Sequence, residues 1–142
     1  MEMAHIVAKR STCYRLNVGA VVTVDNRIVS IGYNGPPSGE PHCTGVGCAT
    51  DGRCTRSIHA EINALYHMPI VSNVLTMYVT DSPCEHCFEE ITKIHWAVDR
   101  VFFSNLYRIN NHLVHPQVKL YRVMANGLII DYQTGELIDG EV

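Results

Sequence analysis

The sequence has 142 residues, of which 46% are hydrophobic and 18% are charged, and its formal net charge is −3. This length predicts a single domain over residues 1–142 with a real core, and the composition is ordinary for a soluble globular protein. No apolar run approaches the length of a membrane span, and the acidic balance argues against a nucleic-acid polymer as partner. The start of the chain lacks the charged-then-apolar build of a signal peptide, so we expect a cytoplasmic protein.

Strands and helices alternate after an initial hairpin. In chain order, the predicted elements are a helix (3–16), two hairpin strands (19–24 and 27–34), a helix (58–68), a strand (76–80), a helix (83–96), a strand (100–104), a helix (116–125) and a last strand or edge segment (128–132). Ser57 is the expected cap of the second helix, and Asn126-Gly127 the expected end of the fourth. This order predicts an α/β fold, a mixed sheet covered by helices on both faces.

Two short motifs carry the chemistry of a metal site. His59 lies two residues before Glu61, and Pro83 precedes the C-x-x-C pair Cys84 and Cys87. One imidazole and two thiolates fill three corners of a tetrahedral zinc and leave the fourth for water, whose pKa the metal lowers. Glu61 is placed to carry a proton from that water to a ring nitrogen and then to a leaving amino group. H-x-E with P-C-x-x-C is typical of zinc nucleobase deaminases, and the alternative is a closed structural zinc site.

Four further cysteines remain: Cys13, Cys43, Cys48 and Cys54. The last three lie in a Gly- and Pro-rich insert at about residues 35–57, and Cys13 lies at the predicted first helix. Together the four could close a second, structural zinc site that clips the insert, with His42 as a possible replacement for one ligand. The alternative is four thiols that bind no metal.

The chain resembles the deoxycytidylate (dCMP) deaminases of the cytidine deaminase superfamily. The matching segments are Ser11-Thr12-Cys13, Val18-Gly19-Ala20-Val21, Gly32-Tyr33-Asn34-Gly35-Pro36-Pro37, His42-Cys43, Ile58-His59-Ala60-Glu61-Ile62-Asn63-Ala64, and Tyr78-Val79-Thr80 with Ser82-Pro83-Cys84. The two zinc motifs identify the superfamily, whereas Gly-Tyr-Asn-Gly and the Cys-rich insert point to the dCMP branch. The resemblance implies a three-layer α/β/α fold with a five-stranded sheet, a hexamer, dUMP as product for thymidylate synthesis, and often a second zinc in the insert.

The resemblance also implies roles for individual residues. Activation by dCTP and inhibition by dTTP would act through Gly32, Tyr33, Asn34 and Gly35. The alternative is that these glycines only shape the exit of a strand. The implied substrate contacts are Asn34 to the sugar, the Ala60 N–H to the pyrimidine, and Tyr107 and Arg108 at the ring and phosphate. The alternative for Tyr107 and Arg108 is a solvated loop pair.

Three other functions compete with dCMP deamination. Within the superfamily they are a tRNA adenosine deaminase and a free-nucleoside cytidine deaminase. The acidic balance, the Gly-Tyr-Asn-Gly match and the insert all oppose the tRNA enzyme. Outside it stands a non-catalytic zinc- or nucleotide-binding scaffold, which the intact set of His59, Glu61, Cys84 and Cys87 opposes.

Overall fold

The structure is a computed structural model that describes residues 1–43, 54–70, 73–94, 97–107 and 113–138. Its helices are α1 (Glu2–Ala8), α2 (Ala60–Tyr66) and α3 (Glu85–Lys93). Its strands are β1 (Gly19–Val24), β2 (Arg27–Tyr33), β3 (Leu75–Asp81), β4 (Val98–Asn105), β5 (Lys119–Val123), β6 (Ile129–Asp131) and β7 (Leu137–Ile138). No helix in the described ranges is long and apolar enough to cross a membrane.

The described strands form one mixed sheet in the spatial order β2-β1-β3-β4-β5-β6-β7. β3, β4 and β5 are parallel, and β1 is antiparallel to both of its neighbours. β2 and β3 therefore run in the same direction on either side of β1, and their carboxyl ends lie at the same edge of the sheet. The segments that follow these two strands carry the two zinc motifs.

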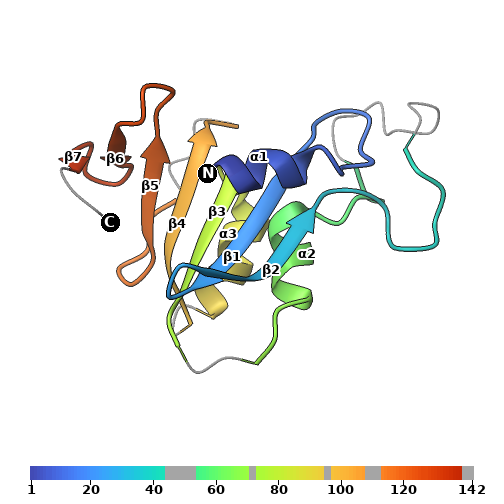
Figure 1. Ribbon diagram of the computed structural model, residues 1–142, viewed down its shortest axis with the longest axis horizontal. Helices are drawn as coiled ribbons and strands as arrows, with labels where there is room; N and C mark the ends of the chain where they lie inside the picture. Colours follow the sequence, from blue (N-terminus) through green and yellow to red (C-terminus); the bar gives the residue numbers. More distant parts are fainter. Residues whose placement is uncertain (44–53, 71–72, 95–96, 108–112, 139–142) are drawn as a thin grey trace.

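Helices cover both faces of the sheet, which confirms the α/β class (Figure 1). α1 packs on one face, where Ala4 and Val7 meet Val21 of β1. α2 and α3 pack on the other face over the main core, whose members include Met77 and Phe103. Apolar β-branched and aromatic side chains on the inner strands bury both faces, as expected for a sheet enclosed between helix layers.

Two glycines allow α1 and α2 to approach the sheet closely. A Cβ added at Gly19 of β1 would lie 2.2 Å from the Ala4 carbonyl oxygen in α1. A Cβ added at Gly32 of β2 would lie 2.2 Å from the Ala60 carbonyl oxygen in α2, on the opposite face. The contacted atoms are backbone atoms, so no side-chain rotation could make room. Gly32 therefore sets the height of α2 above the sheet.

The predicted helix at 116–125 is wrong, because this stretch contains the parallel strand β5. Val118 and Leu120 are fully buried, and the intervening Lys119 is exposed, which is the two-residue alternation of a strand. Gly127 has a positive φ of 85° and lies in the turn from β5 to β6, so Asn126-Gly127 is a hairpin turn instead of a helix end. β6 confirms the predicted strand or edge segment at 128–132. β5 and the short β7 are additional, so the sheet formed by the described residues has seven strands instead of five.

The helices are also shorter than predicted. α1 ends at Ala8, and α3 covers Glu85–Lys93. Ser57 does not cap α2, because its hydroxyl bonds the Ile58 carbonyl and the N-cap is His59. Ile58 instead forms a two-residue antiparallel bridge with Gly35. This bridge ties Ile58, the residue before the N-cap of α2, to the segment that follows β2.

Candidate metal centre and active site

The two zinc motifs meet at the carboxyl edge of the sheet, at the first turns of α2 and α3. His59 is the N-cap of α2, and Cys84 follows β3 as the N-cap of α3. Both residues have extended backbone angles, which turn their side chains out of the helix ends. Cys87 is fully buried in the first turn of α3, whereas His59 and Cys84 keep contact with solvent.

The three ligand atoms lie within 4.8 Å of one another. His59 Nδ1 is 3.2 Å from Cys87 Sγ and 3.5 Å from Cys84 Sγ. A tetrahedral zinc with ordinary Zn–N and Zn–S bonds separates its donors by about 3.5–3.8 Å. Donor types and spacings therefore fit zinc. Among the residues that the structure describes, no other set of three His, Cys, Asp or Glu side chains meets this criterion.

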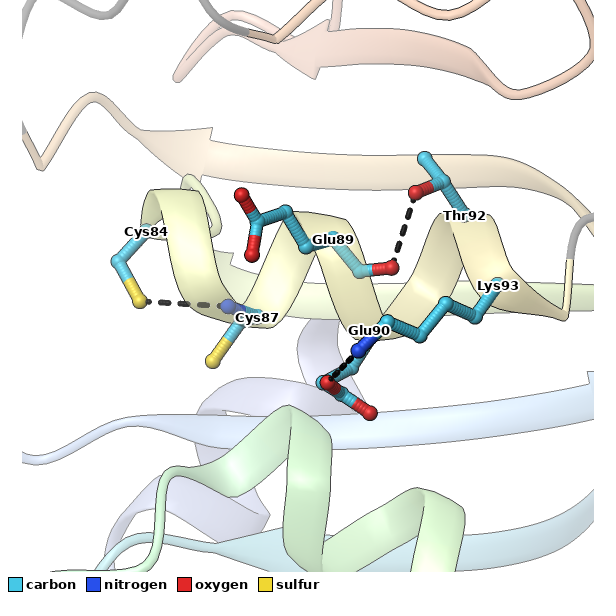
Figure 2. A network of polar contacts seen from close by, with 6 residues as sticks. All are labelled: Cys84, Cys87, Glu89, Glu90, Thr92 and Lys93. Carbon is cyan, nitrogen blue, oxygen red and sulfur yellow. Dashed lines mark hydrogen bonds and ion pairs between the residues drawn. The ribbon is translucent and has the colours of Figure 1, made fainter.

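The two cysteines share a hydrogen bond that lowers the pKa of Cys84 and raises the pKa of Cys87. Both sulfur atoms lie on the same side of the first turn of α3, and the Cys87 N–H points at Cys84 Sγ, 3.5 Å away (Figure 2). The hydrogen bond from the Cys87 thiol and the one with His59 lower the pKa of Cys84 to about 3. The same Cys84–Cys87 bond and burial raise the pKa of Cys87. A divalent cation would replace the shared hydrogen and hold both residues as thiolates.

Glu61 is a buried carboxyl beside this centre. It lies in the first turn of α2 and is only 4% exposed. Burial raises the pKa of Glu61 to about 7, although its backbone N–H and His59 oppose the shift. A carboxyl with a pKa near neutrality can both accept and donate a proton. A group that can carry a proton therefore lies two residues from His59, one of the three donors of the candidate metal centre.

The family assignment follows from comparison with known proteins. The family described as "Cytidine and deoxycytidylate deaminase zinc-binding region" matches residues 1–105. The chain belongs to this family. Together with His59, Cys84, Cys87 and Glu61, this membership makes it a hydrolytic deaminase with a zinc-binding site.

Three relatives illustrate the match. The ComE operon protein 2 of Bacillus subtilis is 33% identical over 96% of this chain and 75% of its own length. The deoxycytidylate deaminase of Schizosaccharomyces pombe is 33% identical over 79% of this chain but only 38% of its own length. The crystal structure of the dCMP deaminase from cyanophage S-TIM5, in complex with dCMP and dUMP, superposes with a TM-score of 0.72 at 31% identity. That match covers 85% of this chain and 91% of the phage chain.

Three of the predicted substrate residues, Ala60, Tyr107 and Asn34, lie near the same edge of the sheet. Ala60 is fully buried at the start of α2, next to His59. Tyr107 follows β4 and is 43% exposed. Arg108 lies outside the described residues. Asn34, at the end of β2, is buried and hydrogen-bonded to the segment around residues 11–18.

Three of the four predicted effector residues pack closely in this structure, and the fourth, Asn34, is held by the hydrogen bonds described above. Gly32 faces α2, and a Cβ at Gly35 would lie 2.3 Å from Thr12 Oγ1. Tyr33 packs against Ala4, Val7 and Val21, the small core cluster between α1 and the sheet, on the face opposite α2. Neither glycine has a positive φ. Close packing is therefore sufficient to explain both glycines, and a contact with effector phosphates stays a prediction.

Of the other four cysteines, Cys13, Cys43 and Cys54 are described and Cys48 is not. The Cys43 N–H donates to the Thr12 carbonyl at 3.3 Å, which places the start of the insert beside Cys13. At the other end, Arg56 donates to the Pro41 carbonyl at 2.8 Å. The two ends of the insert are therefore fastened together.

One positioning residue was not predicted, although it lies in a segment that carries the family resemblance. Ser82 lies between β3 and the Cys84 motif and is only 3% exposed. Its hydroxyl accepts a hydrogen bond from the Tyr107 N–H at 3.0 Å, and its own N–H donates to the Asn105 carbonyl at 2.8 Å. Ser82 therefore joins the metal loop to the segment after β4. A single serine between a strand and a P-C motif carries no pattern that could have indicated this contact.

The rest of α3 is held by local contacts away from the metal ligands. Thr92 donates to the Glu89 carbonyl, and Lys93 pairs with Glu90 on the solvent side (Figure 2).

A hollow of about 530 Å³ lies at the opposite end of the sheet, between the β1–β2 turn and the start of β3. It is far along the strands from His59, Cys84 and Cys87, so it is separate from the candidate metal centre.

Proposed function

We propose that this chain catalyses the zinc-dependent hydrolysis of dCMP to dUMP and ammonia. The observation that supports the reaction is the His59, Cys84 and Cys87 donor cluster beside the buried Glu61 carboxyl. The observation that supports the substrate is the match over most of both chains to a deaminase solved with dCMP and dUMP. The dUMP produced would supply thymidylate synthesis in the cytoplasm.

The chain's own residues divide the proton work. When bound, zinc makes hydroxide available at neutral pH and acts as a Lewis acid. His59, Cys84 and Cys87 would hold it, and Glu61 takes the proton from the attacking water. Glu61 delivers this proton to N3 of the cytosine ring, then takes the second proton from the new C4 hydroxyl and delivers it to the departing amino group. The C4–O bond forms, the C4–N4 bond breaks, and ammonia leaves.

Substrate contacts come from three elements in this proposal. The Ala60 N–H, at the amino end of α2, would donate to the pyrimidine O2. Tyr107 and Arg108 would contact the ring and the phosphate, since a guanidinium fork matches phosphate geometry. Asn34 stays a candidate for the sugar, although three of its four side-chain hydrogen-bonding positions are already used.

The structural zinc, the effectors and the oligomer are further parts of the proposal. Cys13, Cys43, Cys48 and Cys54 would hold a second zinc, which the fastened ends of the insert support. dCTP would activate and dTTP would inhibit at Gly32, Tyr33, Asn34 and Gly35. A hexamer is the proposed assembly. Ile6 of α1 is 53% exposed and Ile31 of β2 is 48% exposed, and these apolar side chains support a contact between subunits at α1 and β2.

The deciding experiment compares three substrates. Zinc-loaded protein is given dCMP, deoxycytidine or an RNA anticodon stem-loop, and ammonia release is measured. We expect turnover of dCMP with kcat/KM at least tenfold above that for deoxycytidine. Arg108→Ala should remove most of this preference, because it deletes the proposed phosphate contact. Equal turnover of dCMP and deoxycytidine, or turnover only of the stem-loop, would reject dCMP as the preferred substrate, and full turnover after chelation would reject zinc.

A further inference from the structure

The side chain of Asn34 is already engaged within the protein. Its Oδ1 accepts hydrogen bonds from Ser11 Oγ at 2.6 Å and from the Val18 N–H at 2.8 Å. Its Nδ2 donates to the Leu16 carbonyl at 2.7 Å. The residue is only 7% exposed. An amide offers two acceptor and two donor positions, so one N–H is left for any other partner.

The backbone of Asn34 holds the same segment. Its carbonyl accepts from Ser11 Oγ at 2.8 Å and from the Thr12 N–H at 3.3 Å. Its N–H donates to the Val18 carbonyl at 3.3 Å. Together these contacts form the Asn34 network, defined as Ser11, Thr12, Leu16, Val18 and Asn34. The network fastens the segment between α1 and β1 to the carboxyl end of β2.

The residue after Asn34 continues this connection to the metal ligand. The Gly35 N–H donates to the Ile58 carbonyl at 3.2 Å, and the Ile58 N–H donates back to the Gly35 carbonyl at 2.8 Å. His59 follows Ile58 directly. Thr12 of the network also fills the space over Gly35, because an added Cβ there would lie 2.3 Å from Thr12 Oγ1. The network and the bridge thus form one continuous path from Ser11 to His59.

We propose that Asn34 is a positioning residue for the metal ligand His59 and acts through the Asn34 network and the Gly35–Ile58 bridge. The side chain fixes the exit of β2, the exit of β2 fixes Ile58, and Ile58 fixes the angle at which His59 enters α2. Ser11 is part of the Asn34 network, since its hydroxyl donates to the backbone carbonyl oxygen and to Oδ1 of Asn34. This inference rests on the proposed zinc function of the site, but its tests do not depend on turnover of dCMP.

The test uses the zinc-loaded full chain and a matched pair of variants. Ser11→Ala removes the hydroxyl, whereas Ser11→Thr keeps it, and neither change touches His59, Cys84 or Cys87. Ser11 Oγ also accepts from the Cys13 N–H at 3.2 Å, so zinc release is followed in a Cys43→Ser background, which lacks the proposed second site. Asn34→Ala removes the hub of the network. Gln133→Ala is the control, because the Gln133 amide likewise clamps two carbonyls, at His115 and Val118, on the far side of the sheet. The measurements are amide hydrogen exchange and the rate of zinc release to a chromogenic chelator.

For Ser11→Ala we expect amide exchange at Val18, Gly35 and Ile58 to be about tenfold faster, and zinc release to be several-fold faster, because both Asn34 oxygens lose the Ser11 donor that holds them in place. Asn34→Ala should show a larger effect in the same direction, and Ser11→Thr should match the wild type. Gln133→Ala should leave zinc release unchanged. If Asn34→Ala fails to fold, the Ser11 pair decides.

Two results would overturn the proposal. One is faster exchange at Val18 in Ser11→Ala with wild-type exchange at Ile58 and wild-type zinc release. The other is an Asn34→Ala protein that releases zinc normally and only raises KM, which would make Asn34 a direct substrate contact. If the wild-type protein holds zinc but turns over no dCMP, the proposed reaction fails, while exchange and zinc release still decide this inference.

Discussion

Gly32→Ala tests whether the packing of α2 on the sheet controls the active site. The new Cβ would lie 2.2 Å from the Ala60 carbonyl oxygen and 2.4 Å from the Ala64 nitrogen. Both are backbone atoms of α2, so the helix must retreat by roughly 1 Å to restore a normal contact distance. Overpacking of this kind costs about 1–3 kcal/mol of unfolding free energy, or a Tm lower by roughly 3–12 °C.

The retreat of α2 would move two functional groups relative to the cysteines of α3. His59 is the N-cap of α2 and Glu61 lies in its first turn. A misplacement of about 1 Å in a catalytic group costs roughly 100-fold in rate, so kcat for dCMP should fall by about that factor. Zinc release should also become faster, because His59 moves away from Cys84 and Cys87.

Gly19→Ala is the matched control. Its Cβ would meet α1 at the same distances, 2.2 Å from the Ala4 carbonyl oxygen and 2.4 Å from the Ala8 nitrogen, but on the other face of the sheet. Thermal unfolding, zinc content and kcat are measured for both variants. We expect similar losses in Tm and a much larger loss of kcat in Gly32→Ala, because Gly19→Ala reaches His59 only indirectly, through Val18 and the Asn34 network. Equal kcat in the two variants would refute the idea that Gly32 protects the geometry of the site.

Three further predictions follow from individual contacts. Glu61→Gln should lower kcat by about 10²–10⁴-fold with zinc content unchanged, because the proton carrier is lost but the ligands remain; elemental analysis and ammonia release check this. Ser82→Ala removes the side-chain acceptor of the part-buried Tyr107 N–H bond, so we expect a stability loss of about 0.5–1.5 kcal/mol and a raised KM for dCMP, measured by unfolding and steady-state kinetics; an unchanged KM would separate Ser82 from substrate binding. Cys43→Ser should remove about one zinc per chain and lower Tm, while kcat falls little; unchanged metal content would exclude Cys43 as a ligand.

The class of the fold and the composition of the metal centre were accessible from sequence. The strands at 19–24, 27–34, 76–80 and 100–104 are rich in Val, Ile and aromatic residues, and the structure has strands at all four. The zinc motifs were predictable because ligand chemistry allows few residue types, and His59, Cys84 and Cys87 do come together. Local propensity and donor chemistry agree in these segments, so sequence alone was sufficient.

The errors arose where a local signal fits two structures. Asn126-Gly127 suits both a helix end and a hairpin turn, and the choice depends on the pairing of β5 with β4, which is a tertiary contact. Ser57 is a good helix cap in isolation, but the bridge between Ile58 and Gly35 holds that residue extended and delays the helix. In both cases a partner distant in the chain decided the local conformation.

The precision of this metal centre depends on residues that have no reactive group. α2 packs mainly on β1 and β2 and touches α3 little, so His59 and Cys84 are positioned separately, each through its own attachment to the sheet. For α2 that attachment consists of Gly32 under Ala60 and the Gly35–Ile58 bridge. For Cys84, at the start of α3, the attachment includes the hydrogen bond from the Ser82 N–H to the Asn105 carbonyl. A chain could therefore keep H-x-E and P-C-x-x-C intact and still lose the spacing of about 3.5 Å that zinc requires, because a single added methyl group at Gly32 is large enough to displace one half of the site.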